Sequence, residues 1–257
     1  MNEWVRRSIE IANAPGYLDN LLEVYPVTQE TERYIPSETK EELRELFYGD
    51  DDYALIKRVL KLPKFPIKDP YVAFLRKREI FLEYNPRTVH RIAEHIRSMG
   101  YERMIKALEE PKEFNRQIGM LFKKWLRTLD YPFLNDDVFV SSDGISFLDG
   151  SENHLLNFAN SYLGCNLNKG PDFIAKVRET YIIGEAKFLT DYGGHQNAQF
   201  EDALRLLRGS DGNALRVAVL DGVVWIKDHT KMYRTVCQLE KPAFTALLLR
   251  EFLESLR

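Results

Sequence analysis

The sequence has few cysteines and no long apolar run. Its 257 residues include two cysteines, Cys165 and Cys237, too few for a small scaffold held by disulfides. No stretch reaches the roughly 20 apolar residues of a membrane-spanning helix, and residues 1–10 show no apolar run typical of a signal peptide. We therefore expect a cytoplasmic protein without a membrane segment. No glycine-rich phosphate-binding loop occurs, so nothing favours an enzyme driven by ATP.

The chain also has little net charge, but its charge is unevenly distributed. The 36 Lys and Arg residues and 39 Asp and Glu residues leave a formal charge of −3. Residues 1–50 contain 5 basic and 11 acidic residues, whereas residues 51–100 contain 11 basic and 6 acidic ones. The basic stretch from Lys57 to Arg91 could bind a polyanion whatever the net charge. It could equally consist of solvated helix faces.

Apolar periodicity divides the chain into two regions. Residues 1–130 show mostly helical spacing, and acidic residues after Ser37 predict a helix that ends near Gly49. Beyond residue 131 the pattern becomes mixed. Asp143-Gly144 between two β-rich runs predicts a hairpin of strands at 138–140 and 145–148. The further elements that we expect are a helix at 151–163, strands at 172–178 and 180–188, a helix at 197–208, a strand at 216–220 and a helix at 242–256.

Charged residues lie within the most apolar of these predicted strands. In the run from Tyr181 to Phe188, strand alternation places Glu185 and Lys187 on one face and apolar residues on the other. If the strands at 172–178 and 180–188 form a hairpin, Asp172 can lie beside Glu185. Two carboxylates this close repel each other unless a cation lies between them. Carboxylate oxygens favour Mg²⁺, which also accepts water and phosphate oxygens as ligands, and Lys187 would then lie next to a scissile phosphate. For the tripeptide alone, a surface ion pair between Glu185 and Lys187 is the competing interpretation.

The motif Pro171-Asp172 followed by Glu185-Ala186-Lys187 resembles that of the PD-(D/E)xK nuclease superfamily, specifically its type II restriction endonucleases. The likeness extends over about residues 140–230. It implies an α/β (α+β) fold with a restriction-endonuclease-like core, in which helices flank a mixed central sheet, preceded by a mostly helical N-terminal region. We expect residues 1–130 to serve DNA recognition and dimerisation, and residues 131–257 to form the catalytic core.

The resemblance also implies an activity. Such an enzyme cuts double-stranded DNA at specific sites with Mg²⁺ and leaves a 5′-phosphate and a 3′-hydroxyl. Asp172 and Glu185 would hold the metal, and Lys187 would orient or activate water. Cleavage of both strands of a palindrome predicts a homodimer, and restriction requires a DNA methyltransferase that protects the host. The alternatives are a DNA repair or junction nuclease of the same fold, a DNA-binding protein that retains the core without catalysis, and an ordinary α/β scaffold.

Several neighbouring residues are candidates for supporting roles. Glu152 would be a further metal ligand or water-holding residue, or simply an acid at a helix N-terminus. Amides can read adenine in the major groove, but they also cap helices and hold loops. For His195 the competing role is a hydrogen bond within the loop. For Lys169 the competing role is that of a solvated surface residue. The candidate DNA-binding residues are Gln196, Asn197, Gln199, His195 and Lys169.

Overall fold

The chain folds into two compact units. The computed structural model describes residues 1–26, 33–110 and 117–257. Unit 1 comprises residues 1–28 and 113–257, and unit 2 comprises residues 29–112. The functional boundary expected at residue 130 differs from these limits, because Val5, Leu21 and Phe122 belong to the same apolar core as the sheet of unit 1.

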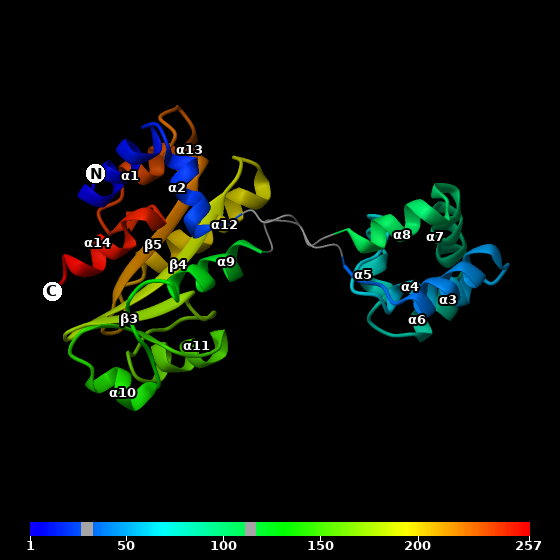
Figure 1. Cartoon of the computed structure of the whole chain (residues 1–257), viewed down its shortest axis with the longest axis horizontal. Coiled ribbons are helices and arrows are strands. Elements are labelled where there is room, and N and C mark those ends of the chain that lie inside the picture. Colours follow the sequence, from blue (N-terminus) through cyan, green and yellow to red (C-terminus); the bar gives the residue numbers. More distant parts are fainter. Residues whose placement is uncertain (27–32, 111–116) are drawn as a thin grey trace. The chain divides into compact units, whose positions relative to one another are not determined.

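Unit 1 is built on a six-stranded mixed sheet with the strand order β1-β2-β3-β4-β5-β6 (Figure 1). The pairs β2/β3 and β3/β4 are antiparallel, and the remaining pairs are parallel. This sheet and its flanking helices confirm the expected α/β class. The strands are β1 (Phe133–Leu134), β2 (Ile145–Leu148), β3 (Phe173–Val177), β4 (Thr180–Leu189), β5 (Leu215–Gly222) and β6 (Ala243–Phe244).

Helices cover both faces of the sheet because alternate residues of each strand face opposite sides. Ile182 and Ala186 of β4 join the larger apolar cluster with α1, α2, α9 and α14, whereas Ile183 joins a second cluster with α10 and α11. The helices of unit 1 are α1 (Glu3–Ala12), α2 (Tyr17–Val24), α9 (Ile118–Leu126), α10 (Asp136–Ser141), α11 (Glu152–Ser161), α12 (Gly194–Arg208), α13 (Lys231–Cys237) and α14 (Leu249–Glu254), with 3₁₀ turns at Val223–Trp225 and Ala246–Leu248.

Two sequence-based assignments are wrong. The expected strand at 138–140 is part of α10, because Asn135 caps this helix by accepting a hydrogen bond from the Val138 backbone nitrogen and two acidic residues occupy its first turn. Strand β2 therefore pairs with β1 and β3 and forms no hairpin with that segment. The helix expected at 242–256 begins only at Leu249, after β6 and a 3₁₀ turn. In contrast, β3 and β4 confirm the hairpin expected from 172–188.

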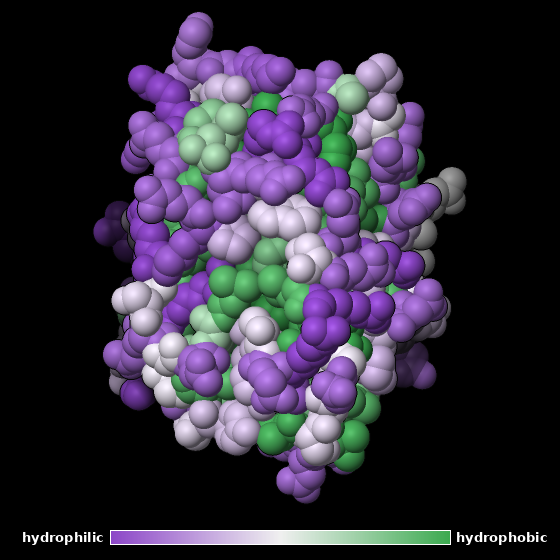
Figure 2. Space-filling view, turned by 90° about the vertical axis from the view of Figure 1, so that its left-hand side faces the viewer, coloured by the Kyte–Doolittle hydropathy of each residue, from purple (hydrophilic) through white to green (hydrophobic). Residues whose placement is uncertain are grey.

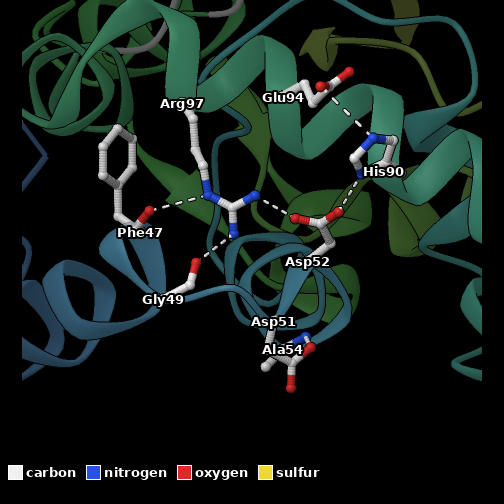
Figure 3. A network of polar contacts seen from close by, with 8 residues as sticks. All are labelled: Phe47, Gly49, Asp51, Asp52, Ala54, His90, Glu94 and Arg97. Carbon is white, nitrogen blue, oxygen red and sulfur yellow. Dashed lines mark hydrogen bonds and ion pairs between the residues drawn. The ribbon is translucent and has the colours of Figure 1, made fainter.

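Unit 2 is helical and has an apolar core. Leu55, Ile92 and Met104 are completely buried in it. Arg97 of α7 donates hydrogen bonds to the carbonyl oxygens of Phe47 (3.0 Å) and Gly49 (2.9 Å) and pairs with Asp52, joining three helices (Figure 3). The helices are α3 (Ser37–Tyr48), α4 (Asp52–Leu60), α5 (Val72–Leu75), α6 (Ile80–Tyr84), α7 (Pro86–Met99) and α8 (Tyr101–Glu109).

The visible surface of unit 1 is mostly hydrophilic. Figure 2 shows one face of unit 1, where hydrophilic side chains surround a smaller central group of apolar ones. Small apolar groups of this kind are common on folded proteins. Among the described helices, none is long and apolar enough to cross a membrane.

Candidate active site

Strands β3 and β4 bring the three predicted catalytic side chains together. Asp172 directly precedes β3, where its backbone nitrogen donates to the carbonyl oxygen of Gly184 (2.9 Å). Its Oδ2 accepts a hydrogen bond from the backbone nitrogen of Ala186 (2.9 Å) and lies 4.0 Å from Nζ of Lys187. Lys187 also pairs with Oε1 of Glu185. The antiparallel register, which places Phe173 opposite Gly184, sets this convergence.

The site is largely shielded from water. The side chains of Glu185, Lys187 and Asp172 are 5%, 16% and 17% exposed. A buried carboxylate is costly unless it is paired, and Glu185 has two ammonium partners, because Nζ of Lys169 also lies 3.2 Å from its Oε1. The cluster therefore concentrates two carboxylates and two ammonium groups beside residues 185–187 of β4.

Lys169 responds to this concentration of acids. Burial lowers the pKa of its ammonium group, but the carboxylates of Glu185, Asp172 and Glu152 outweigh that effect and raise the pKa above its ordinary value. Lys169 therefore stays protonated at neutral pH. The predicted DNA-binding residue Lys169 thus contacts Glu185, one of the three predicted catalytic residues.

Glu152 reaches the site from another element. It is the first residue of α11, whose N-cap is Ser151, and its backbone packs against the loop that carries Asp172. A Cβ atom on Gly170 would lie 2.2 Å from the carbonyl oxygen of Glu152. Only glycine therefore allows this close approach. The side chain of Glu152 is exposed, and its charge acts on Lys169.

The predicted amides lie at the start of α12, immediately after the loop that follows β4. Gln196 is buried and its Oε1 accepts a hydrogen bond from the backbone nitrogen of Thr190 (3.2 Å), so it holds the loop. Asn197 is exposed and donates to the carbonyl oxygen of Tyr192 (3.1 Å). Gln199 contacts the exposed His195 at 3.1 Å.

A buried carboxylate that the sequence analysis missed lies at the end of β5. Asp221 is completely buried and accepts hydrogen bonds from the hydroxyls of Tyr25 (2.8 Å) and Thr245 (2.5 Å). Burial raises its pKa to about 6, although these hydrogen bonds oppose the rise. In sequence, Asp221-Gly222 resembles an ordinary turn, and its partners lie far away along the chain. The register of β4 and β5 places Asp221 opposite Phe188, the residue that follows Lys187 in the sequence.

The donor set fits a hard divalent cation. The carboxylates of Asp172 and Glu185 are oxygen ligands, and Mg²⁺ binds one or two protein carboxylates while keeping waters or taking phosphate oxygens. In residues 1–26, 33–110 and 117–257, no cluster of three or more His, Cys, Asp or Glu side chains is arranged to hold a metal.

Comparison with known proteins places this geometry in context. A family model described as Tsp45I type II restriction enzyme matches residues 2–256. No curated protein and no solved structure matches the chain. Because the family match spans nearly the whole sequence, the chain belongs to the Tsp45I type II restriction enzyme family and is a site-specific deoxyribonuclease.

Proposed function

We propose that this enzyme hydrolyses phosphodiester bonds of double-stranded DNA at the cluster of Asp172, Glu185 and Lys187 with Mg²⁺. The observation that carries the proposal is the convergence of three side chains from two paired strands, with Lys187 Nζ paired with Glu185 and 4.0 Å from Asp172 Oδ2. Their burial raises the strength of each electrostatic interaction in the site.

Asp172, Glu185 and Lys187 would have different roles in the reaction. Asp172 and Glu185 would hold the cation, because an oxygen of each lies near Nζ of Lys187 and the backbone nitrogen of Ala186 fixes the Asp172 carboxylate. Bound Mg²⁺ supplies a Lewis acid that polarises the phosphate and makes water more acidic. In the substrate complex, Lys187 would turn from Glu185 to orient the attacking water and offset the charge that develops on the phosphate oxygens. Attack in line would leave a 5′-phosphate and a 3′-hydroxyl.

Other residues would position the DNA. We assign contacts with the substrate to Lys169 beside the cluster and to His195, Asn197 and Gln199 at the start of α12. Gln196 would support them by holding the loop after β4. Glu152 would supply a further oxygen near the metal, since its backbone abuts the loop of Asp172.

The biological setting follows from the proposed activity. Cleavage of both strands of a palindrome usually uses two active sites, so the enzyme would act as a homodimer. It would restrict foreign DNA in the cytoplasm, and a cognate DNA methyltransferase would protect the host sequence.

The test is digestion of a sequenced plasmid by the purified protein with Mg²⁺, with EDTA as the control. We expect fragments with ends at fixed positions, and ends that accept a label from polynucleotide kinase only after dephosphorylation. Cleavage restricted to branched DNA would support the repair or junction alternative, whereas DNA binding without any cleavage would contradict an active nuclease.

A further inference from the structure

A positively charged hollow lies in unit 2, outside the catalytic cluster. It lies beside the short helix α5 and has a volume of about 740 Å³. Lys68, Arg76 and Lys77 line it together with the apolar Val72 and a single carboxylate, that of Asp69. The three cations are exposed at the surface.

The carboxylate of Asp69 is already neutralised. Its side chain is 6% exposed, pairs with Arg91 at 2.7 Å and accepts a hydrogen bond from the backbone nitrogen of Tyr71 (2.9 Å). The hydrogen bond with Arg91 is the main cause that lowers the pKa of Asp69. It therefore does not offset the charge of the cations in the hollow.

The cations of the hollow lack such carboxylate partners. The side chains of Lys68 and Lys77 make no hydrogen bond or ion pair with any described residue. Arg76 donates to the carbonyl oxygen of Leu62 (2.9 Å), which fixes its guanidinium without neutralising it. By contrast, other cations of the basic stretch are paired: Lys57 with Glu79, Arg58 with Glu42, Lys64 with Glu110, and Arg91 with Asp69.

The α5 segment also carries exposed aromatic side chains at its N-cap and within the helix. Tyr71 and Phe74 are 56% and 57% exposed, and the ring of Phe74 stacks on Phe81 at 4.5 Å. A short segment that exposes both aromatic groups and unpaired cations fits a ligand that has both anionic and apolar surfaces. The sugar-phosphate backbone of DNA has both, and its regularly spaced phosphates match several separate cations.

We propose that the hollow beside α5, with Lys68, Arg76 and Lys77, binds the backbone of the DNA that the enzyme cuts. The inference rests on the proposed function for the identity of the ligand. It assigns unit 2 a role in affinity, because contacts with phosphates position a duplex without reading its sequence.

The experiment compares two double variants of the full chain. The first, Lys68→Gln with Lys77→Gln, removes two charges from the hollow. The matched control, Arg103→Gln with Lys106→Gln, removes two charges from the exposed face of α8 in the same unit. Affinity for a fluorescent mixed-sequence duplex is measured in EDTA, which prevents metal-dependent cleavage, over a series of salt concentrations. Thermal unfolding verifies that both variants fold.

We expect the hollow variant to bind about tenfold more weakly at moderate salt. The slope of log affinity against log salt should fall by about 2, close to 0.9 for each lost phosphate contact. The control should retain affinity within about twofold and the wild-type slope. The double variant Lys68→Arg with Lys77→Arg, which keeps both charges, should bind the duplex with wild-type affinity.

Equal losses of affinity in both variants would overturn the inference, because they would show a dependence on net charge alone. Unchanged affinity of the hollow variant would also overturn it. Plasmid cleavage by the wild type with Mg²⁺ is measured in parallel. If the wild type cuts but the hollow variant binds normally, only the role of the hollow fails. If the wild type does not cut, the proposed function fails, whatever the binding data show.

Discussion

The two units bury different kinds of side chains. All eight buried polar or charged residues of the described chain lie in unit 1, and they include Glu185, Arg216 and Asp221. The described core of unit 2 is apolar, with residues such as Leu55 and Ile96 completely buried. Several of its charged side chains pair outside this core, as Arg97 does with Asp52 (Figure 3).

This difference indicates that unit 1, rather than unit 2, holds the candidate reactive groups. Burial of a charge costs free energy that an apolar core avoids, so a unit with several buried charges is the place to look for reactive groups. Unit 1 contains the proposed catalytic cluster, and unit 2 contains the hollow lined by Lys68, Arg76 and Lys77. Substitutions of buried and of exposed groups test that division.

Among substitutions that leave Asp172 and Glu185 intact, the largest effect is expected from removing the ammonium group of Lys187. Lys187→Ala should slow DNA cleavage at least about a thousandfold, because a positioned charge is lost from a site that excludes water. Affinity for DNA should stay within severalfold of the wild type. Single-turnover cleavage and duplex binding measure the two quantities. The control is Lys231→Ala, whose side chain is 83% exposed, and equal losses in both variants would contradict a catalytic role.

A smaller loss is expected from Gly170→Ala. The new Cβ would meet the backbone oxygen of Glu152, which cannot rotate away, so the loop that carries Asp172 must shift. A displacement of about 1 Å can cost about a hundredfold in rate. Gly144→Ala is the matched control, since a Cβ added there would have no neighbour within 4 Å among the described residues. Cleavage by Gly170→Ala at the rate of this control would show that the loop geometry is unimportant.

Asp221 should make unit 1 sensitive to pH. Its folded pKa of about 6 exceeds the ordinary value of 3.8, so the unfolded chain loses the proton first. The stability that Asp221 contributes is therefore fully present below about pH 4 and is lost as the pH rises to about 6, by up to about 3 kcal/mol. Asp221→Asn should remove this contribution. Denaturant unfolding of both proteins from pH 4 to pH 7 measures the difference, and parallel curves would refute the prediction.

The smallest effect is expected at an exposed ion pair of α1. Nη1 of Arg6 lies 2.7 Å from Oε1 of Glu10, and the two side chains are 51% and 56% exposed. Arg6→Gln should change the free energy of unfolding by no more than about 0.5 kcal/mol. A loss of several kcal/mol in denaturant unfolding would show that surface charges stabilise unit 1 as much as buried ones.

The sequence predicted the catalytic cluster better than it predicted its surroundings. Alternation along β4 and the hairpin of β3 and β4 depend on neighbouring residues, so Asp172, Glu185 and Lys187 could be grouped before the structure was known. Their roles remain predictions. The network of Asp221 joins Tyr25 and Thr245 across about 200 residues of sequence, and no local pattern reveals such contacts.

Local patterns also misled where two structures compete for the same residues. The run from Val138 to Val140 has the composition of a strand, but the cap at Asn135 and two following acids favour a helix. Likewise, α1, α2 and α9 read as members of a helical region, although their apolar faces pack on the sheet of unit 1. Periodicity predicts a helix without identifying the surface that it covers.

The most direct test of the proposed active site is the Mg²⁺ dependence of plasmid cleavage by the wild type, Asp172→Asn and Glu185→Gln. We predict that the wild-type rate rises with Mg²⁺ to saturation and is zero in EDTA, while neither variant cleaves at any Mg²⁺ concentration despite normal folding. Cleavage by the wild type in EDTA, or wild-type rates in both variants, would contradict a metal-dependent site built on these two carboxylates.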